Sequence, residues 1–442
     1  MSEATDMRPA DAPPSAGRAP AQEAKLVPPR RVLIIVENLP VPFDRRVWSE
    51  ATTLAQHGYE VSVICPRGPG ASVPFEIIDG IHIYRHWLPA EGRGLFGYLA
   101  EYSVALFWEF VLSFKVLRTR GFDAIHACNP PDLIFLVGAF YKLRLGKRFI
   151  FDHHDINPEL FEAKFERRGF FWRMMVLFER LTFKAADISI ATNQSYRAIA
   201  IGRGRMSPER VFVVRSGPNL ARVRLFPADA KWKSGRKFLV AYVGVIGEQE
   251  GLDLLLQAAK HVGARRDDVQ FVIVGDGPEL EQVKKLAAAL ELGDRVTFTG
   301  RVDDATLFTI LSTADVCANP DRPNAMNDKS TMNKIMEYMA LGKPIVQFDL
   351  TEGRFSAGES SLYARNTEPG DFGELIVQLL DDPAARERMG ATGRRRIADE
   401  LSWEHEAPKL LAAYDALDWG KHGTRALRGA RDTRPCFGMV VG

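Results

Sequence analysis

Residues 32–65 read VLIIVENLPVPFDRRVWSEATTLAQHGYEVSVIC and predict the unit from which the fold is built. Two apolar, β-branched runs, Val32–Val36 and Val61–Cys65, flank a helical stretch at Asp44–Gln56. Strands that are apolar on both faces and alternate with helices indicate a parallel sheet that is covered on both sides. This segment therefore predicts a doubly wound α/β domain.

The same alternation recurs along the chain in two series. The first continues with strands at Ala124–Cys128, Arg148–Phe151, Ile188–Ala191 and Val211–Val214. The second has strands at Leu239–Val243, Phe271–Val274, Val296–Thr299, Val316–Ala318 and Ile345–Phe348. Two doubly wound, Rossmann-like domains are predicted, facing a cleft at the carboxyl ends of both sheets.

The predicted boundaries follow from these two series. The segments are a disordered leader (1–29), an N-terminal Rossmann-like domain (30–215), a linker (216–236), a C-terminal Rossmann-like domain (237–402), a helix that returns to the first domain (403–418) and a flexible tail (419–442). The linker is placed where prolines and polar residues interrupt the pattern.

Composition excludes several classes of protein. The chain has 442 residues, a formal net charge of +2 and 46% hydrophobic residues. This length fits two domains, and the near balance of charge argues against a nucleic-acid partner. Neither a disulfide framework nor a zinc site is predicted from the scattered cysteines, which are Cys65, Cys128, Cys317 and Cys436. We expect a protein of the reducing cytoplasm.

No targeting or membrane-spanning segment is predicted. Residues 1–29 lack the apolar run of a signal peptide. The most apolar stretch, Leu95–Leu117, carries Glu101, Glu109 and Lys115, which are costly in an isolated spanning helix.

The most informative motif is KSTMNKIMEYMALGKPIV at residues 329–346. Its apolar spacing predicts an amphipathic helix over residues 330–341, which Gly342 ends. The polar face begins with hydroxyl groups and free backbone amides, a natural site for an anion, and Lys329 and Lys334 add two positive charges there. The motif therefore predicts a phosphate site.

Glu337 lies two turns further along the same face, roughly 10 Å from Ser330 at the rise of an α-helix. One helix can thus hold a diphosphate at its start and hydrogen-bond a ribose through Glu337. A solvated polar face would give a similar pattern, but this helix lies late in the second domain, beside a glycine-bearing loop. We therefore favour a nucleotide site.

This motif resembles that of the retaining glycosyltransferases of family 4, which have the GT-B fold, and the resemblance covers about residues 30–418. Supporting segments are VGDGPE at 274–279, VTFTGR at 296–301 and Ala314-Asp315. The resemblance implies a nucleotide-sugar donor in the cleft. Its diphosphate would lie at residues 330–334, close to the loop 244–247. Its ribose would contact Glu337, and its base would lie beside residues 300–302. The residues implied to bind the donor are Gly244, Gly247, Gly300, Arg301, Val302, Ser330, Thr331, Asn333, Ile335 and Glu337.

The chain departs from the family pattern at three places. Lys329 stands where the family often has a glutamate, and Val245 and Glu250 stand where it commonly has an arginine and a lysine. Residues 40–46, PVPFDRR, replace the usual glycine-rich loop. A departing diphosphate needs cations, so Lys329 and Lys334 are the expected catalytic cations. These departures resemble a bacterial polysaccharide-assembly subgroup of the family.

The segment FDHHDINPE at residues 151–159 follows a predicted strand directly. The resemblance implies that His154 lies beside the donor sugar, and Asp155 is expected to assist proton movement. Asp155 or Asn157 could equally cap the next helix. No metal site is predicted, because the adjacent His153 and His154 lack a third ligand. No cofactor is expected, since the nucleotide-sugar is a substrate.

Five more polar residues are expected to contact the acceptor or a phosphate. They are Arg45, Arg46, Asn129, Asp132 and Arg215. A helix start with proline in its first turn explains Asn129–Asp132 about as well. A solvated helix start explains the two neighbouring arginines about as well.

Two helices of the first domain are unusually apolar. They are Leu95–Leu117 and Phe170–Lys184, and the second combines aromatic with basic residues. Such helices can lie on an anionic membrane, although ordinary core packing is an equal alternative. The hypothesis is peripheral attachment to the inner face of the plasma membrane, with a glycan or polyprenyl-linked acceptor.

Three functions fit the sequence. The leading one is a retaining hexosyltransferase that moves sugar from a nucleotide donor to a lipid-linked or growing surface glycan. The second is a nucleotide-sugar epimerase of the same fold, which would convert the donor without an acceptor. The third is a non-catalytic sugar- or nucleotide-binding protein. The missing export signal and the helix at 329–337 argue against this third function.

Overall fold

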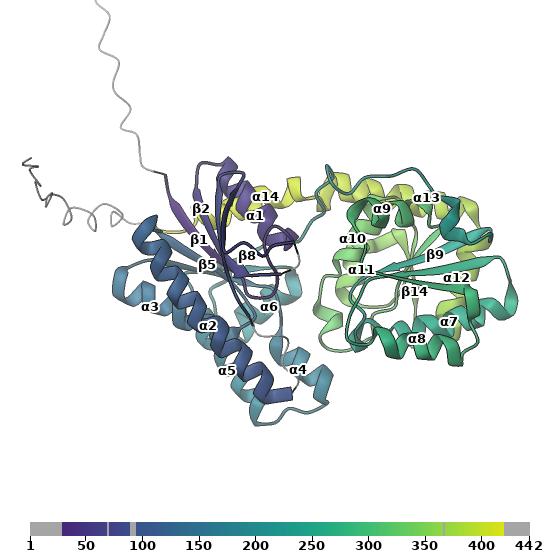
Figure 1. The fold of residues 1–442 in the computed structure, drawn as a ribbon, viewed down its shortest axis with the longest axis horizontal. Coiled ribbons are helices and arrows are strands. Elements are labelled where there is room, and N and C mark those ends of the chain that lie inside the picture. The colour runs from purple at the N-terminus through teal and green to yellow at the C-terminus, as the bar shows by residue number, and fades with distance from the viewer. Residues whose placement is uncertain (1–28, 69, 89–93, 366, 420–442) are drawn as a thin grey trace, which may run out of the picture.

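The protein folds into two α/β domains that lie side by side in the computed structural model (Figure 1). The structure describes residues 29–68, 70–88, 94–365 and 367–419, without the side chains of residues 94–102. Almost all of the predicted leader and tail, together with Cys436, lies outside the described residues. The prediction of two doubly wound domains is confirmed.

The first domain is built on an eight-stranded sheet of order β3-β4-β2-β1-β5-β6-β7-β8. Its strands are parallel except β3, which pairs antiparallel with β4. The strands are β1 (Arg31–Ile35), β2 (Glu60–Pro66), β3 (Phe75–Ile78), β4 (Ile81–His86), β5 (Ala124–Cys128), β6 (Arg148–His153), β7 (Ile188–Ala191) and β8 (Val211–Val213). The helices are α1 (Arg45–Gln56), α2 (Gly94–Thr119), α3 (Phe135–Leu145), α4 (Asn157–Phe165), α5 (Phe170–Ala185) and α6 (Gln194–Gly202).

The second domain is built on a six-stranded parallel sheet of order β11-β10-β9-β12-β13-β14. The strands are β9 (Phe238–Val243), β10 (Val269–Val274), β11 (Val296–Gly300), β12 (Val316–Asn319), β13 (Ile345–Phe348) and β14 (Ser361–Ala364). The helices are α7 (Leu252–Arg265), α8 (Leu280–Ala289), α9 (Asp304–Thr313), α10 (Asn333–Ala340), α11 (Thr351–Ala357), α12 (Pro369–Asp381) and α13 (Pro383–Arg396).

The chain returns to the first domain in helix α14 (Trp403–Asp415), where the sequence predicted a returning helix. The indole of Trp403 donates a hydrogen bond to Thr53 Oγ1 of α1 at 2.9 Å. Tyr414 Oη and His126 Nδ1 of β5 lie 2.8 Å apart in the buried core. The last helix therefore completes the hydrophobic core of the first domain.

Three elements differ from the sequence-based expectation. The hairpin β3–β4 was not predicted, because β3 is an edge strand whose residues alternate between exposed and half-buried. The short strand β14 was not predicted either. The motif helix begins at Asn333 rather than at residue 330, since residues 327–329 form a separate 3₁₀ turn and residues 330–332 are extended.

None of the helices in the described part of the chain combines the length and the apolar character that spanning a bilayer requires.

Candidate functional site

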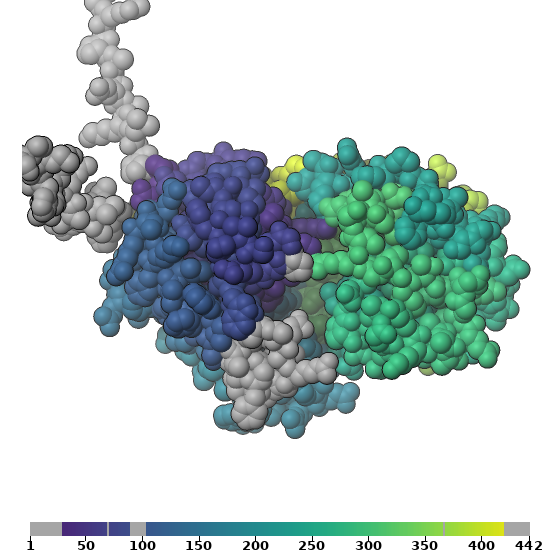
Figure 2. Space-filling view, viewed as in Figure 1, coloured from purple at the N-terminus to yellow at the C-terminus, as the bar shows by residue number. Residues whose placement is uncertain are grey.

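A cavity of about 970 Å³ lies between the two domains, where their surfaces meet in Figure 2. The predicted site residues that line it are Arg45, Arg46, Gly244, Arg301, Val302, Asn333 and Glu337. Its walls come from the carboxyl ends of β9, β10 and β11, the start of α1, and the linker after β8. The cavity therefore occupies the edge at which doubly wound sheets bind ligands.

Four charged side chains meet across this cavity, and we call them the cleft cluster: Arg45, Arg222, Asp304 and Glu337. Glu337 of α10 pairs with Arg45 of α1 at 3.1 Å and with Arg222 of the linker at 3.5 Å. Asp304 of α9 pairs with the same arginines at 2.8 and 2.7 Å. Side-chain exposure is 15% for Glu337 but 44% and 48% for Arg45 and Asp304, so water reaches the cluster. A ligand that hydrogen-bonds Glu337 can replace an arginine there.

The sequence did not single out Arg222 or Asp304. Arg222 lies in a segment that looked like a linker, and Asp304 follows Asp303, which caps α9 by accepting from the Thr306 amide. No local pattern marks either residue, because their partners come from other elements of the chain.

Lys334 lies behind the cavity wall rather than in its lining. Its Nζ pairs with Asp321 Oδ1 at 2.8 Å and lies 4.8 Å from the centre of the Tyr242 ring. Burial raises the pKa of Asp321, and Lys334 opposes that rise. A Cβ built on Gly244 would lie 3.5 Å from Lys334 Nζ, so the ammonium is next to the loop after β9.

The glycine loops of the second domain approach one another closely. A Cβ on Gly275 would lie 1.8 Å from the carbonyl oxygen of Gly244, and Gly275 has a φ of +140°. Only glycine fits at this position. Gly247 and Gly300 belong to the same sheet edge but are not among the residues that line the cavity.

The segment before α10 faces the first domain. The Asn193 amide donates to the Lys329 carbonyl at 2.7 Å and to Thr331 Oγ1 at 3.0 Å. Ser330 Oγ donates to the Met326 carbonyl and lies 3.2 Å from Tyr196 Oη. These hydroxyls therefore join the domains instead of opening the helix, which corrects the predicted helix start.

Two further residues of the motif make contacts inside the protein instead of facing the cavity. Lys329 Nζ donates to the Ala325 carbonyl at 2.9 Å. The side chain of Ile335 is fully buried in the core, and its backbone amide donates to the Met332 carbonyl at 3.1 Å. The first turn of α10 has no side-chain cap, which leaves the amides of Asn333 and Lys334 available to an anion.

Arg215 also joins the two domains. Its guanidinium pairs with Glu352 at 3.2 Å, donates to Thr331 Oγ1 at 3.3 Å and lies over the Phe355 ring at 4.1 Å. Arg215 is 4% exposed and does not line the cavity. In this arrangement it is an interdomain contact.

A buried ionic cluster lies beneath the cleft in the first domain, and we call it the buried cluster: Arg46, Glu50, His126 and Asp152. Arg46 pairs with Asp152 at 2.8 Å and with Glu50 at 3.1 Å. His126 Nε2 lies 3.3 Å from Asp152 and 3.6 Å from Glu50. Although burial alone would raise it, the pKa of Asp152 is held well below its usual range by Arg46. Burial raises the pKa of Glu50 and lowers that of His126.

Residues of the buried cluster also form groupings of metal-ligand type with the neighbouring Cys128 and His154. His126, Cys128 and Asp152 form one, and Glu50, Asp152 and His154 form another. Both share Asp152, and Glu50 and Asp152 already face the Arg46 guanidinium. A permanent cation between these carboxylates opposes binding of a metal ion, so we interpret the cluster as an ion-pair network.

The His154 loop rests on the buried cluster and on Asn129. His154 Nε2 lies 2.9 Å from Arg46 Nε and contacts the Asp152 carboxylate. Asn129 Oδ1 accepts from the backbone amides of His154 and Asp155 at 2.8 and 3.2 Å. The ring of His154 is therefore held in one place at the carboxyl end of β6.

Asn129 and Asp132 are buried supports of this loop. Asn129 Nδ2 donates to Asp132 Oδ1 at 3.0 Å and to the Asp155 carbonyl at 2.6 Å. Burial raises the pKa of Asp132 to about 6 and also raises that of Asp155. Asn129 and Asp132 are 1% and 6% exposed, and neither lines the cavity.

Two domain families match the chain. Residues 44–217 match the family described as Glycosyl transferase 4-like domain, and residues 237–382 match the one described as Glycosyl transferases group 1. The two matches follow the division of the chain into its two sheets.

Individual relatives agree with these matches. The D-inositol 3-phosphate glycosyltransferase of Salinispora tropica is 27% identical over 392 residues, which are 82% of this chain and 78% of that protein. The chain covers only about half of the length of several other curated relatives that it matches.

Two solved structures share the fold. Sucrose-phosphate synthase from Thermosynechococcus elongatus superposes with a TM-score of 0.71 at 21% identity, over 87% of this chain and 98% of that one. The Anabaena protein HepE, in complex with UDP and glucose, superposes with a TM-score of 0.67 at 15% identity, over 88% of this chain and 100% of that one. At such identities the likeness establishes the fold alone.

Proposed function

We propose that the chain is a family 4-type glycosyltransferase of the GT-B fold, as the two matched domain families support, and that it transfers a sugar, with retention, from a nucleotide-sugar to a glycan or polyprenyl-linked acceptor. The observation that carries the proposal is the position of Glu337 and the first turn of α10 on the interdomain cavity. HepE, which shares the fold, was solved with UDP and glucose.

In the proposed complex, the diphosphate lies at the uncapped first turn of α10. The free amides and the positive end of the helix dipole favour an anion there. Lys334, next to Gly244, supplies the positive charge that neutralises the leaving diphosphate. Lys334 then exchanges Asp321 for the phosphate as its partner.

Glu337 holds the ribose in this proposal. It follows Asn333 by four residues, about 6 Å along the helix, which suits a pentose next to a diphosphate. The ribose hydroxyls take the place of Arg45 and Arg222 on the carboxylate. Arg301 and Val302 border the base on the far wall of the cavity.

We propose front-side attack for the transfer itself. The carboxylates among the described residues of the cavity wall are Asp276, Asp303, Asp304 and Glu337. Asp276 and Asp303 accept from backbone amides, Asp304 pairs with two arginines and Glu337 is assigned to the ribose, so none of the four stands out as a nucleophile. A covalent intermediate would need a free carboxylate beside the anomeric carbon. An oxygen of the leaving diphosphate therefore takes the proton of the acceptor hydroxyl, with His154 beside the sugar.

Peripheral membrane attachment is the remaining part of the proposal. Helices α2, α3 and α5 lie along the outer side of the first domain (Figure 1), and Phe107, Leu143 and Phe170 are 60%, 83% and 74% exposed. Exposed aromatic and aliphatic side chains of this size mark interaction surfaces. A lipid-linked acceptor would then be close to the cleft. Flotation with anionic vesicles tests this, and undiminished flotation of a Phe107→Ser/Phe170→Ser variant would contradict it.

The experiment for the proposed activity uses the purified protein and a panel of nucleotide-sugars. Thermal shift with UDP, GDP and ADP identifies the base, because a bound ligand raises the apparent stability. Transfer assays with membrane lipid extract then follow the release of the nucleoside diphosphate. We expect release to depend on the acceptor and the product to keep the donor's anomeric configuration. An isomerised donor formed without acceptor would instead indicate an epimerase.

A further inference from the structure

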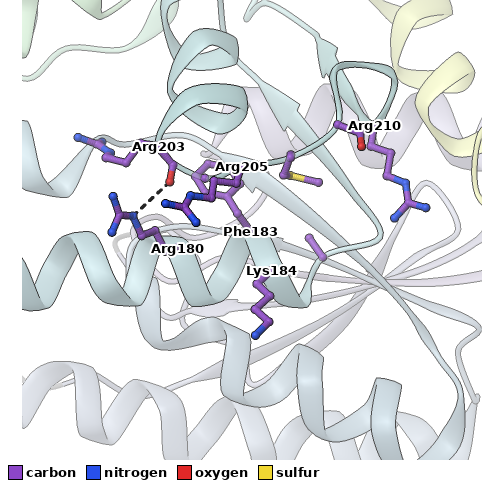
Figure 3. A pocket seen from close by; sticks show the side chains of 10 residues that line it. Arg180, Phe183, Lys184, Arg203, Arg205 and Arg210 are labelled. Atoms are coloured by element: carbon purple, nitrogen blue, oxygen red, sulfur yellow. Dashed lines mark hydrogen bonds between the residues drawn. The ribbon is translucent and has the colours of Figure 1, made fainter.

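A second cavity, of about 550 Å³, lies in the first domain and has a strongly basic rim. Arg180 and Lys184 project from α5, whereas Arg203, Arg205 and Arg210 come from the segment after α6 (Figure 3). The floor consists of buried apolar side chains, namely Phe183, Ala186 and Met206. We call this hollow the basic cavity.

The basic cavity is separate from the interdomain cleft. Helix α6 begins beside Asn193, which contacts the second domain, and ends at Gly202 beside the basic cavity. The helix has 9 residues, and about 13 Å of α-helix therefore separates the interdomain contact at Asn193 from the basic cavity.

Few carboxylates neutralise the positive charges of the rim. No carboxylate is among the described residues that line the cavity. Arg203 is paired with Glu159 and Glu179 on its other side, and Arg180 donates to the Arg203 carbonyl at 3.2 Å. Lys184, Arg205 and Arg210 have no ion-pair partner within the described part of the chain. Like charges brought together around one hollow favour a multivalent anion.

Two backbone hydrogen bonds hold the segment that carries Arg205. The Gly204 amide donates to the Ile199 carbonyl at 2.9 Å, and the Met206 amide donates to the Ala200 carbonyl at 3.0 Å. These bonds hold Arg205 between them in a left-handed conformation, with a φ of +57°.

The other side of the rim is held by a side chain. Arg197 donates to the Val211 and Pro208 carbonyls at 3.2 and 3.0 Å, which holds the 3₁₀ turn Pro208–Arg210 against α6. The backbone of the rim is therefore preorganised, which lowers the cost of binding.

We propose that the basic cavity binds a phosphate monoester or diphosphate group. Guanidinium groups match the planar, two-pronged geometry of phosphate oxygens, and several arginines around one hollow favour a doubly charged group over a carboxylate. Lys184 adds a point charge on the same side of α5.

The neighbouring surface suggests a lipid as one source of that phosphate. Leu177, Arg180 and Lys184 are spaced three and four residues apart, so they share one face of α5, and Leu177 is 51% exposed. Leu143 of α3 is 83% exposed, and its neighbour Lys142 donates to the Ala185 carbonyl at 2.7 Å. Apolar side chains next to the basic cavity suit a lipid that carries a phosphate headgroup, whereas a free diphosphate needs the cavity alone.

The test compares a Lys184→Ala/Arg205→Ala variant with an Arg173→Ala control. Arg173 is an exposed cation on the same face of α5 that does not line the cavity. All three positions are exposed or on the rim, and circular dichroism checks that the variants fold. Calorimetric titration with inorganic pyrophosphate forms the first arm. Flotation with phosphatidylcholine vesicles that contain phosphatidic acid or phosphatidylglycerol forms the second.

We expect the wild type and the Arg173 control to bind one pyrophosphate that the double variant loses. The loss should weaken that site by at least about tenfold, or about 1.4 kcal/mol. The affinity of the cleft for pyrophosphate should be the same in all three proteins. A preference for phosphatidic acid that the double variant loses identifies a lipid phosphate, and loss in the pyrophosphate arm alone identifies a free ligand.

Equal binding by the double variant and the Arg173 control in both arms would overturn the proposal. Equal weakening in both proteins would also overturn it, because it would show attraction by diffuse surface charge. The readout is binding away from the cleft, so either result leaves the proposed transfer activity untouched.

Discussion

The buried cluster and the cleft cluster are built from the same kinds of side chain but differ in access to water. Asp152 and Glu50 are fully buried with Arg46, whereas Asp304 and Arg45 are about half exposed. When a buried carboxylate loses its counter-ion, no other group can take the place of that counter-ion. An exposed carboxylate can instead bind water or a ligand. The first arrangement therefore fixes the His154 loop, and the second leaves Glu337 open to exchange.

The largest effect is expected where the buried cluster is broken. Asp152→Asn leaves the Arg46 guanidinium without its 2.8 Å partner and should destabilise the protein by about 3–5 kcal/mol. The pKa of Asp152 is lowered, so its contribution is present at neutral pH and is lost as the pH falls below the ordinary carboxyl range. Urea unfolding of wild type and variant at neutral and acidic pH measures both effects. A difference that persists unchanged in acid would contradict the assignment.

Glu109 shows what a buried carboxylate does without a counter-ion. It is 1% exposed on α2, neither oxygen has a hydrogen-bond partner among the described residues, and burial raises its pKa from 4.5 to about 8. A raised pKa means that its contribution to stability is full at low pH and is lost as the pH rises through 8. The unfolded chain ionises above about pH 4.5 while the folded carboxyl stays mostly neutral up to about pH 8, so stability should fall by about 3 kcal/mol between acid and neutral pH.

Glu109→Gln removes this titration while keeping the shape of the side chain. We expect the variant to gain about 3 kcal/mol on wild type between about pH 5 and pH 7, measured by urea unfolding across that range. Exposed Glu281→Gln on α8 is the control and should show no such gain, since its side chain is 77% exposed. Parallel pH profiles for wild type and the Glu109 variant would show that the carboxyl finds a partner in solution.

Glu337→Ala tests the cleft cluster as a ligand site. A carboxylate that hydrogen-bonds a ribose contributes about 1.5–3 kcal/mol, so nucleoside diphosphate binding should weaken about 10- to 100-fold. Calorimetric titration with the diphosphate chosen by the thermal-shift panel measures the change. Glu281→Ala is again the control. Wild-type affinity in the Glu337 variant would show that the ribose does not bind at Glu337.

The sequence predicts what depends on local pattern. The apolar runs predicted most strands of both sheets to within two residues, and the motif at 329–346 predicted a helix with Glu337 on the cavity. It did not predict that Ser330 and Thr331 contact Tyr196 and Asn193, because those contacts join segments far apart in the chain.

The same limit applies to the charged residues. Arg45 and Arg46 are adjacent and chemically identical, and the sequence predicted that both contact the acceptor or a phosphate, with a solvated helix start as an equal alternative. Their position on α1 sends Arg46 into the buried cluster and Arg45 across the cleft. Only the tertiary structure separates these two roles, and the difference in burial decides how much each ion pair contributes.

The smallest effect is expected for Asp304→Asn in the cleft cluster. Its carboxylate bonds Arg45 and Arg222, and Arg222 foremost lowers its pKa, yet its side chain is 48% exposed. Exposed pairs contribute about 0–1 kcal/mol and are screened by salt, so urea unfolding should change by no more than about 1 kcal/mol. Because this substitution removes one carboxylate that faces an arginine, as Asp152→Asn does, the two variants form a matched pair. A loss at Asp304 equal to that at Asp152 would mean that the cleft arginines are locked in place, and ligand exchange at Glu337 would then require the domains to separate first.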